Sequence, residues 1–284
     1  MRDTEMNPNR RQMIQTIGLF GITGIGCGLC GCRSAPVTER RQLILVPESQ
    51  ELALGAQAFS ETISTEQISN NQPMADIVHK VGQRIANVAG RDDYDWEFRL
   101  IASSQQNAFC LPGGKVAVYE GILPVCEHEA GLAVVMAHEV AHALARHGGE
   151  RMSHSMAADG LKRVAETIAG KYVPDKQQLL MQAYGVGTKY GVLLPYNRKQ
   201  ESEADHIGVN LMARAGYDPV VAPGFWRKFA AIKGEEGQGG LADEFMSTHP
   251  SDERRAQELL ALMDEAKSIY QQAPEKIGIG QRLI

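Results

Sequence analysis

The chain has 284 residues, of which 43% are hydrophobic and 22% are charged. These values are ordinary for a globular protein and exclude a disordered chain, a collagen and a polytopic membrane protein. The net charge of −5 and the lack of a Lys/Arg-rich block argue against a nucleic-acid partner. Only 6% of the residues are aromatic, which weakens any surface for stacking single-stranded bases.

The N-terminus has the pattern of an export signal. Arg10 and Arg11 precede an uncharged run that ends Leu29-Cys30-Gly31-Cys32. A basic start followed by a short apolar stretch is typical of a signal peptide, whereas a spanning helix needs about 20 strongly apolar residues. The end of the run resembles a bacterial lipobox, which implies cleavage before Cys32 and lipid on that cysteine. A retained anchor, and export by the general or the twin-arginine route, stay open.

We therefore expect residues 1–31 to be a lipoprotein signal peptide and residues 32–47 to be an extended tether. The protein would be attached to a membrane through its N-terminal lipid. It would face the periplasm of a bacterial cell envelope, on the inner or the outer membrane.

The next elements alternate between helical and strand periodicity. Residues 48–65 and 74–89 carry helical apolar spacing, and residues 96–100 alternate as a half-buried strand does. Two β-rich runs, 107–111 and 115–119, flank Pro112-Gly113-Gly114 and predict a hairpin.

Helices dominate the rest of the chain. Residues 127–147 predict one buried helix that Gly148-Gly149 stops, and residues 197–215 and about 252–270 predict two more. The fold class is therefore α+β, mostly helical, with a small sheet. One domain would span 48–270, followed by a C-terminal tail at 271–284.

The buried helix carries the sequence His138-Glu139-Val140-Ala141-His142. Side chains at i and i+4 share a helix face, so two imidazoles can reach one Zn²⁺. Glu139 lies beside them and can take a proton from a water that zinc activates. The motif predicts one zinc ion per chain and a hydrolytic reaction.

The third ligand is not a nearby histidine. An HExxHxxGxxH site needs Gly at 145 and His at 148, but Ala145 and Gly148 stand there. His147 is out of register, and we interpret it as a cation at the helix end. A carboxylate on the helix 197–215 is the alternative: Glu201 and Asp205 share a face, one suited to bind zinc and the other to hold an imidazole tautomer. Glu203 points about 200° away. The alternative without a functional role is that these acidic residues form a solvated helix face.

Several ordered motifs give the chain a family resemblance over roughly residues 36–265. They are PVT at 36–38, RQL at 41–43, NAFCLPGGKVAVYEGIL at 107–123, GLAVVMAHEVAHALARHGGERM at 131–152, ESEADHIG at 201–208 and STHPSDERRAQEL at 247–259. The chain resembles the gluzincin peptidases that include the CAAX prenyl proteases, HtpX, the mitochondrial Oma-type protease and the periplasmic proteases BepA and LoiP. It is most similar to the Oma/LoiP branch.

The resemblance implies a zincin fold in which the edge strand of the small sheet flanks the active-site helix. It makes Glu201 the third zinc ligand and Asp205 the residue that orients a zinc histidine. Asn107, Ala108, Phe109 and Cys110 would form the edge strand on which an extended substrate pairs. Cys110 departs from the small apolar residue found in many relatives.

A late His-Pro…Arg motif is matched by His249 and Arg255, with Arg254 the weaker match. His249 could be no more than a capping residue of the helix that follows it, or it could have one of two active roles. It could donate a hydrogen bond to the oxyanion, or it could bind zinc as a fourth ligand and hold the enzyme latent, which the resemblance favours slightly. Cys110 and Cys126 could form a disulfide, or stay as two buried thiols.

The expected function is zinc-dependent cleavage of internal peptide bonds in unfolded or misfolded envelope proteins, as quality control. Two alternatives stay open. A zincin scaffold could act mainly as a chaperone, but it would have no need of Glu139. An aminopeptidase is the other, but the edge strand argues against it.

Overall fold

The computed structural model describes residues 32–166, 196–236 and 253–283, together with Phe245 and His249. The predicted signal peptide at 1–31 lies outside these residues. Within the described ranges, no helix has the length and apolarity that crossing a membrane requires.

Two amphipathic helices follow the expected periodicity. Helix α2 (Glu48–Thr65) has the predicted bounds, and α3 (Gln72–Val88) begins two residues earlier than predicted. The side chain of Asn71 accepts a hydrogen bond from the Met74 amide and caps α3. The buried face of α3 packs against α5 and β3.

The sheet has three strands in the order β3-β5-β4. Strand β3 (Glu97–Ile101) is parallel to β5 (Lys115–Tyr119), which is antiparallel to β4 (Ala108–Leu111). The expected hairpin is therefore present, and Gly113 and Gly114 form its turn with positive φ angles of 88° and 79°. Strand β4 lies at the edge of the sheet and contacts α5.

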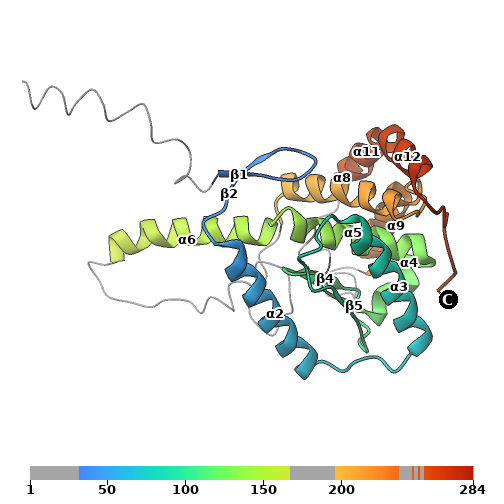
Figure 1. Ribbon diagram of the computed structural model, residues 1–284, viewed down its shortest axis with the longest axis horizontal. Coiled ribbons are helices and arrows are strands. Elements are labelled where there is room, and N and C mark those ends of the chain that lie inside the picture. The colour runs from blue at the N-terminus through green and yellow to red at the C-terminus, as the bar shows by residue number, and fades with distance from the viewer. Residues whose placement is uncertain (1–31, 167–195, 237–244, 246–248, 250–252, 284) are drawn as a thin grey trace, which may run out of the picture.

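Helix α5 (Glu129–Leu144) lies at the centre of the molecule and is buried almost throughout. Figure 1 shows it between the sheet and α8. The single helix predicted over 127–147 is in fact broken: Arg146 adopts a left-handed φ of 54°, and α6 (His147–Glu166) begins directly after it. Gly148 and Gly149 lie inside α6 and do not stop a helix. A Cβ at Gly149 would clash with the Glu51 carboxylate, which explains this glycine.

Two later helices, α8 (Arg198–Arg214) and α9 (Val221–Glu236), pack against α5. Helices α11 (Glu253–Ala261) and α12 (Met263–Gln272) pack on α8, and η1 (Glu120–Ile122) and α4 (Leu123–Cys126) lead into α5. Asn197 and Gln200 form a capping box on α8. The helix predicted over 252–270 is two helices that meet at Leu262. The overall class is α+β and mostly helical, as predicted.

Both ends of the described chain pack on the domain. Residues expected as an extended tether form a hairpin of β1 (Cys32–Ser34) and β2 (Arg41–Leu43). This hairpin is held by Gln42, whose side chain donates a hydrogen bond to the Ala145 carbonyl at 2.7 Å. The predicted C-terminal tail also binds the domain, since the Glu129 amide donates to the Gln281 carbonyl at 2.9 Å.

Candidate active site

Four buried side chains from three parts of the chain converge on one point. Helix α5 supplies His138 and His142, whose Nε2 atoms lie 3.0 Å apart. Glu201 of α8 places Oε1 3.3 Å from His142 Nε2 and Oε2 3.4 Å from His138 Nε2. His249 Nδ1 lies 3.3 Å from His138 Nε2 and 3.2 Å from Glu201 Oε1. The four ligand atoms all lie within 4.8 Å of one another.

These spacings fit a tetrahedral zinc site. Zinc–nitrogen bonds of about 2.0–2.1 Å place neighbouring ligand atoms about 3.3–3.4 Å apart at the corners of a tetrahedron, close to the 3.0–3.4 Å separations of the individual pairs given above. The charges fit as well. Burial lowers the pKa of His138, but the neighbouring carboxylates of Asp205 and Glu201 outweigh it and raise that pKa to about 9. The carboxylates around this ring therefore favour a cation, and a metal ion supplies one.

Glu139 lies beside this cluster with a carboxylate that is 2% exposed. Its Oε1 has no hydrogen-bond partner, and His249 Nε2 lies 3.5 Å from it. Burial raises the pKa of this carboxyl above its ordinary value. A buried carboxylate with a raised pKa and an unpaired oxygen is suited to take up a proton.

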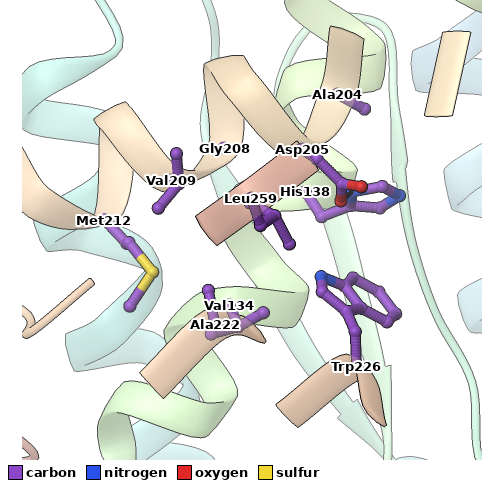
Figure 2. Close-up of a pocket in the computed structure, with 10 residues that line it drawn as sticks. All are labelled: Val134, His138, Ala204, Asp205, Gly208, Val209, Met212, Ala222, Trp226 and Leu259. Atoms are coloured by element: carbon purple, nitrogen blue, oxygen red, sulfur yellow. Dashed lines mark ion pairs between the residues drawn. The ribbon is translucent and has the colours of Figure 1, made fainter. Parts of the chain in front are cut away.

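Asp205 and Arg255 support the cluster from behind. Asp205 Oδ1 lies 3.1 Å from His138 Nδ1, so the carboxylate can hold the ring with Nε2 turned to the site. Figure 2 shows Asp205 facing His138 above the ring of Trp226. Arg255 grips Asp205 with two hydrogen bonds of 2.7 Å and reaches Glu201 Oε2 at 2.7 Å. Arg254, the weaker sequence match, is partly exposed and pairs with Glu258 instead.

A close approach of two helices makes this geometry possible. Gly208 of α8 faces the backbone of α5 at Ala137 and His138. It also lines the small cavity behind His138 in Figure 2, whose volume of about 10 Å³ is enough for about one water. The small residue brings Glu201 of α8 within reach of the two histidines.

Aromatic rings hold the histidines in place, and no sequence pattern predicted their role. Tyr196 packs against His142 with ring centroids 3.8 Å apart and the rings tilted by 32°, and its ring centroid lies 4.9 Å from that of His249. Phe245 stacks on His249 at 4.5 Å, and Trp226 packs edge-on against His138 at 5.0 Å. Neither the spacing nor the composition around Tyr196 and Trp226 distinguishes them from core residues.

The interpretation of His147 as a cation at a helix end is wrong. The side chain is fully buried, and burial lowers its pKa, which favours the neutral ring. Its Nδ1 lies 2.8 Å from His142 Nδ1, and its Nε2 lies 2.8 Å from Glu203 Oε2. Glu203 does point away from the Glu201 face, as predicted, but it meets His147 rather than solvent.

The predicted substrate strand lies beside α5. Asn107, Ala108, Phe109 and Cys110 are each at most 2% exposed, so the strand is covered in this structure. Cys110 and Cys126 are buried free thiols and form no disulfide.

Residues 74–263 match Peptidase family M48. The mitochondrial metalloendopeptidase OMA1 of Schizosaccharomyces pombe is 37% identical over 235 residues, 82% of this chain and 66% of its own. The enzyme of the same name from Saccharomyces cerevisiae is 30% identical over 273 residues, 90% of this chain and 75% of its own. The β-barrel assembly-enhancing protease of Escherichia coli is 25% identical over 209 residues, 72% of this chain and 42% of its own.

The chain therefore belongs to Peptidase family M48, the gluzincin family that its motifs resemble. Its site is that of a zinc metalloendopeptidase, with His138, His142, Glu201 and His249 as the residues able to hold the metal. Except for the budding-yeast enzyme, the chain spans less than two thirds of the length of the relatives named above.

The predicted location in a bacterial envelope is wrong by the same comparison. The two mitochondrial enzymes are 37% and 30% identical to this chain, whereas the bacterial protease is 25% identical. The prediction depended on a lipobox-like pattern of a few residues, and identity over more than 200 residues carries far more information.

Proposed function

We propose that this protein cleaves internal peptide bonds of unfolded or misassembled proteins, with Glu139 as the general base. The observation that carries the proposal is the buried set of His138, His142 and Glu201 with Glu139 beside it, whose Oε1 makes no hydrogen bond. When bound, zinc polarises the scissile carbonyl and increases the acidity of the attacking water.

The residues of the chain then perform the remaining steps. Glu139 Oε1 takes the proton of the attacking water and passes it to the leaving amine. Asp205 holds His138 from behind, and Arg255 keeps Asp205 and Glu201 charged. Burial opposes the charge on Glu201, but Arg255 and the histidines outweigh it and hold the pKa of that carboxyl well below its usual value.

His249 acts as a latch in this proposal. A catalytic zinc site keeps one position open for water or substrate. His249 Nδ1, which lies 3.3 Å from His138 Nε2 and 3.2 Å from Glu201 Oε1, would occupy that position when zinc is bound. The buried strand β4 is consistent with a latent enzyme, in which neither zinc nor the substrate strand is accessible. Withdrawal of His249 would open the fourth position and leave its ring free to donate to the oxyanion.

The substrate would pair with the edge of β4 as an added strand. Pairing between backbones gives affinity with little demand on side chains, which suits unfolded proteins of varied sequence. The name of the Escherichia coli relative, the β-barrel assembly-enhancing protease, also supports misassembled proteins as substrates. Attachment to a membrane through lipid on Cys32 stays a prediction, which the mass of the mature N-terminal peptide tests.

Glu139→Gln tests the central claim. The zinc-loaded variant should keep its metal and fold but cleave casein about 10²–10⁴-fold more slowly. Glu127→Gln is the matched control, because Glu127 is exposed next to the start of the same helix. Near-normal cleavage by pure Glu139→Gln would overturn the mechanism. A zinc-loaded wild type that suppresses aggregation of unfolded protein but cleaves none would favour the chaperone alternative.

His249→Ala tests the latch. Loss of a fourth ligand should raise basal cleavage of casein, whereas loss of an oxyanion donor alone should lower the rate about 10²–10³-fold. An unchanged rate would reject both roles.

A further inference from the structure

The two zinc histidines of α5 are supported in a similar way, although only one support was expected. His138 is backed by the Asp205 carboxylate, which Arg255 grips. On the opposite side, His142 Nδ1 faces His147, and His147 faces the carboxylate of Glu203. An arginine completes this side too: Arg40 Nε donates to Glu203 Oε2 at 2.7 Å.

The hydrogen-bond donors and acceptors that link His142, His147 and Glu203 can be assigned in only one way. His142 turns Nε2 toward His138 and Glu201, where a metal ligand needs a lone pair. Its proton therefore lies on Nδ1 and is donated to His147 Nδ1. A neutral His147 then carries its own proton on Nε2 and donates it to Glu203. Glu203 accepts this bond and those of Arg40 and Thr38.

Arg40 binds Glu203 although the two residues are far apart in the sequence. It lies in the hairpin region before α2, 163 residues from Glu203. Its two terminal nitrogens also bind both carboxylate oxygens of Glu150 at 2.7 Å each, and Gln200 donates to the same carboxylate. Arg40 is thereby fixed between α6 and α8 with only 26% of its side chain exposed.

We propose that Arg40, Glu203 and His147 are positioning residues that hold His142 in the tautomer with Nε2 facing the metal. The N-terminal hairpin then contributes to the active site. The inference deepens the proposed function but is tested separately from it, because zinc affinity and the His142 proton can be measured without any substrate.

Three substitutions test this chain of hydrogen bonds from His142 through His147 and Glu203 to Arg40, which we call the relay. They are His147→Phe, His147→Asn and Arg40→Met. Phe removes the acceptor for His142, whereas Asn places an oxygen where Nδ1 lies and restores that one bond. Loss of such a supporting bond typically costs about 10–100-fold in metal affinity. Competition of the zinc-loaded protein with a chromophoric chelator should show this loss for His147→Phe, substantial recovery for His147→Asn and a smaller loss for Arg40→Met. Arg33→Met is the control, since Arg33 lies in the same hairpin but pairs with Glu48.

Nitrogen-15 NMR of zinc-loaded protein labelled at histidine gives a readout that general destabilisation does not imitate. The wild type should show a slowly exchanging ring proton on His142 Nδ1, which is lost in His147→Phe and kept in His147→Asn. Zinc affinity within twofold of wild type for folded His147→Phe would overturn the proposal, and so would an unprotonated Nδ1 on His142. If the zinc affinity of Arg40→Met equals that of Arg33→Met while His147→Phe shows the expected loss, the role assigned to Arg40 is wrong.

The proposal stays testable in two further cases, one in which a variant does not fold and one in which the wild type cleaves no substrate. If His147→Phe does not fold, Glu203→Gln and Arg40→Met are measured in its place, and wild-type zinc affinity in both overturns the relay. If wild type binds zinc but cleaves no casein, the proposed function fails, while zinc affinity still decides the relay.

Discussion

Substitution of Gly208 by alanine tests whether the approach of α8 to α5 sets the metal site. A Cβ at this position would lie 3.1 Å from the His138 amide nitrogen and 3.2 Å from the Ala137 carbonyl carbon and oxygen. These neighbours are the backbone of a buried helix and cannot rotate away. The two helices must therefore separate by a few tenths of an ångström.

The expected cost follows from two opposing terms. Alanine is about 0.8–1.0 kcal/mol better than glycine inside a helix, but overpacking costs about 1–3 kcal/mol. Gly224→Ala in α9 isolates the first term, because a Cβ there meets nothing within 4 Å. The Gly208 variant should thus be about 1–3 kcal/mol less stable than the Gly224 variant, or about 2–12 °C lower in Tm at roughly 2–4 °C per kcal/mol.

Zinc affinity should fall in the same variant. Gly208 and Glu201 are two helical turns apart, about 10 Å, so a shift of α8 at Gly208 moves Glu201 relative to His138. Metal–ligand distances tolerate only about ±0.2 Å. Thermal unfolding with and without zinc, together with chelator competition, measures both effects. The reasoning is refuted if Gly208→Ala matches Gly224→Ala in stability and wild type in zinc affinity.

Three further outcomes are expected. Glu201→Ala should lose stoichiometric zinc, measured by elemental analysis, because it removes a ligand; retention of one zinc per chain would contradict the assignment. Removal of zinc by a chelator should lower Tm, since a ligand at 100 times its Kd stabilises by about 2.7 kcal/mol. Glu150→Gln should be less stable than wild type at neutral pH. Burial opposes the charge on Glu150, but hydrogen bonds from Arg40 and Gln200 outweigh it and lower the pKa of its carboxyl. This stabilisation is therefore complete above pH 4.5 and is lost as the pH falls through the lowered pKa. Urea unfolding of both proteins at pH 7 and pH 4 checks it, and a constant difference would contradict it.

Features that depend on local spacing could be predicted from the sequence. His138 and His142 are four apart on one helix, so the helix itself brings them together. The same holds for the facing pair Glu201 and Asp205 and for the hairpin around Gly113-Gly114. The motif around His249 and Arg255 could be placed near the metal only through the family resemblance, since no local geometry joins it to α5.

Other features were decided by contacts between distant segments. The sequence indicated that Gly148-Gly149 would stop a helix, because glycine has low helix propensity. In the structure, Gly149 instead makes room for Glu51, which binds Arg146 at the break between α5 and α6. Propensity describes a residue in isolation, whereas a close approach from another helix changes which residue fits.

His147 shows the same difference between features that local spacing predicts and features that distant contacts decide. The sequence by itself determined two metal-binding imidazoles, a base and a carboxylate helix, since each depends on periodicity within one element. It could not determine that His147 is buried and neutral, because its partners come from α8 and, through Glu203, from Arg40 in the N-terminal hairpin. A hydrogen bond between residues 56 or 163 positions apart leaves no periodic signal. Only the tertiary structure, which buries these polar groups together and so requires them to pair, decides what His147 does.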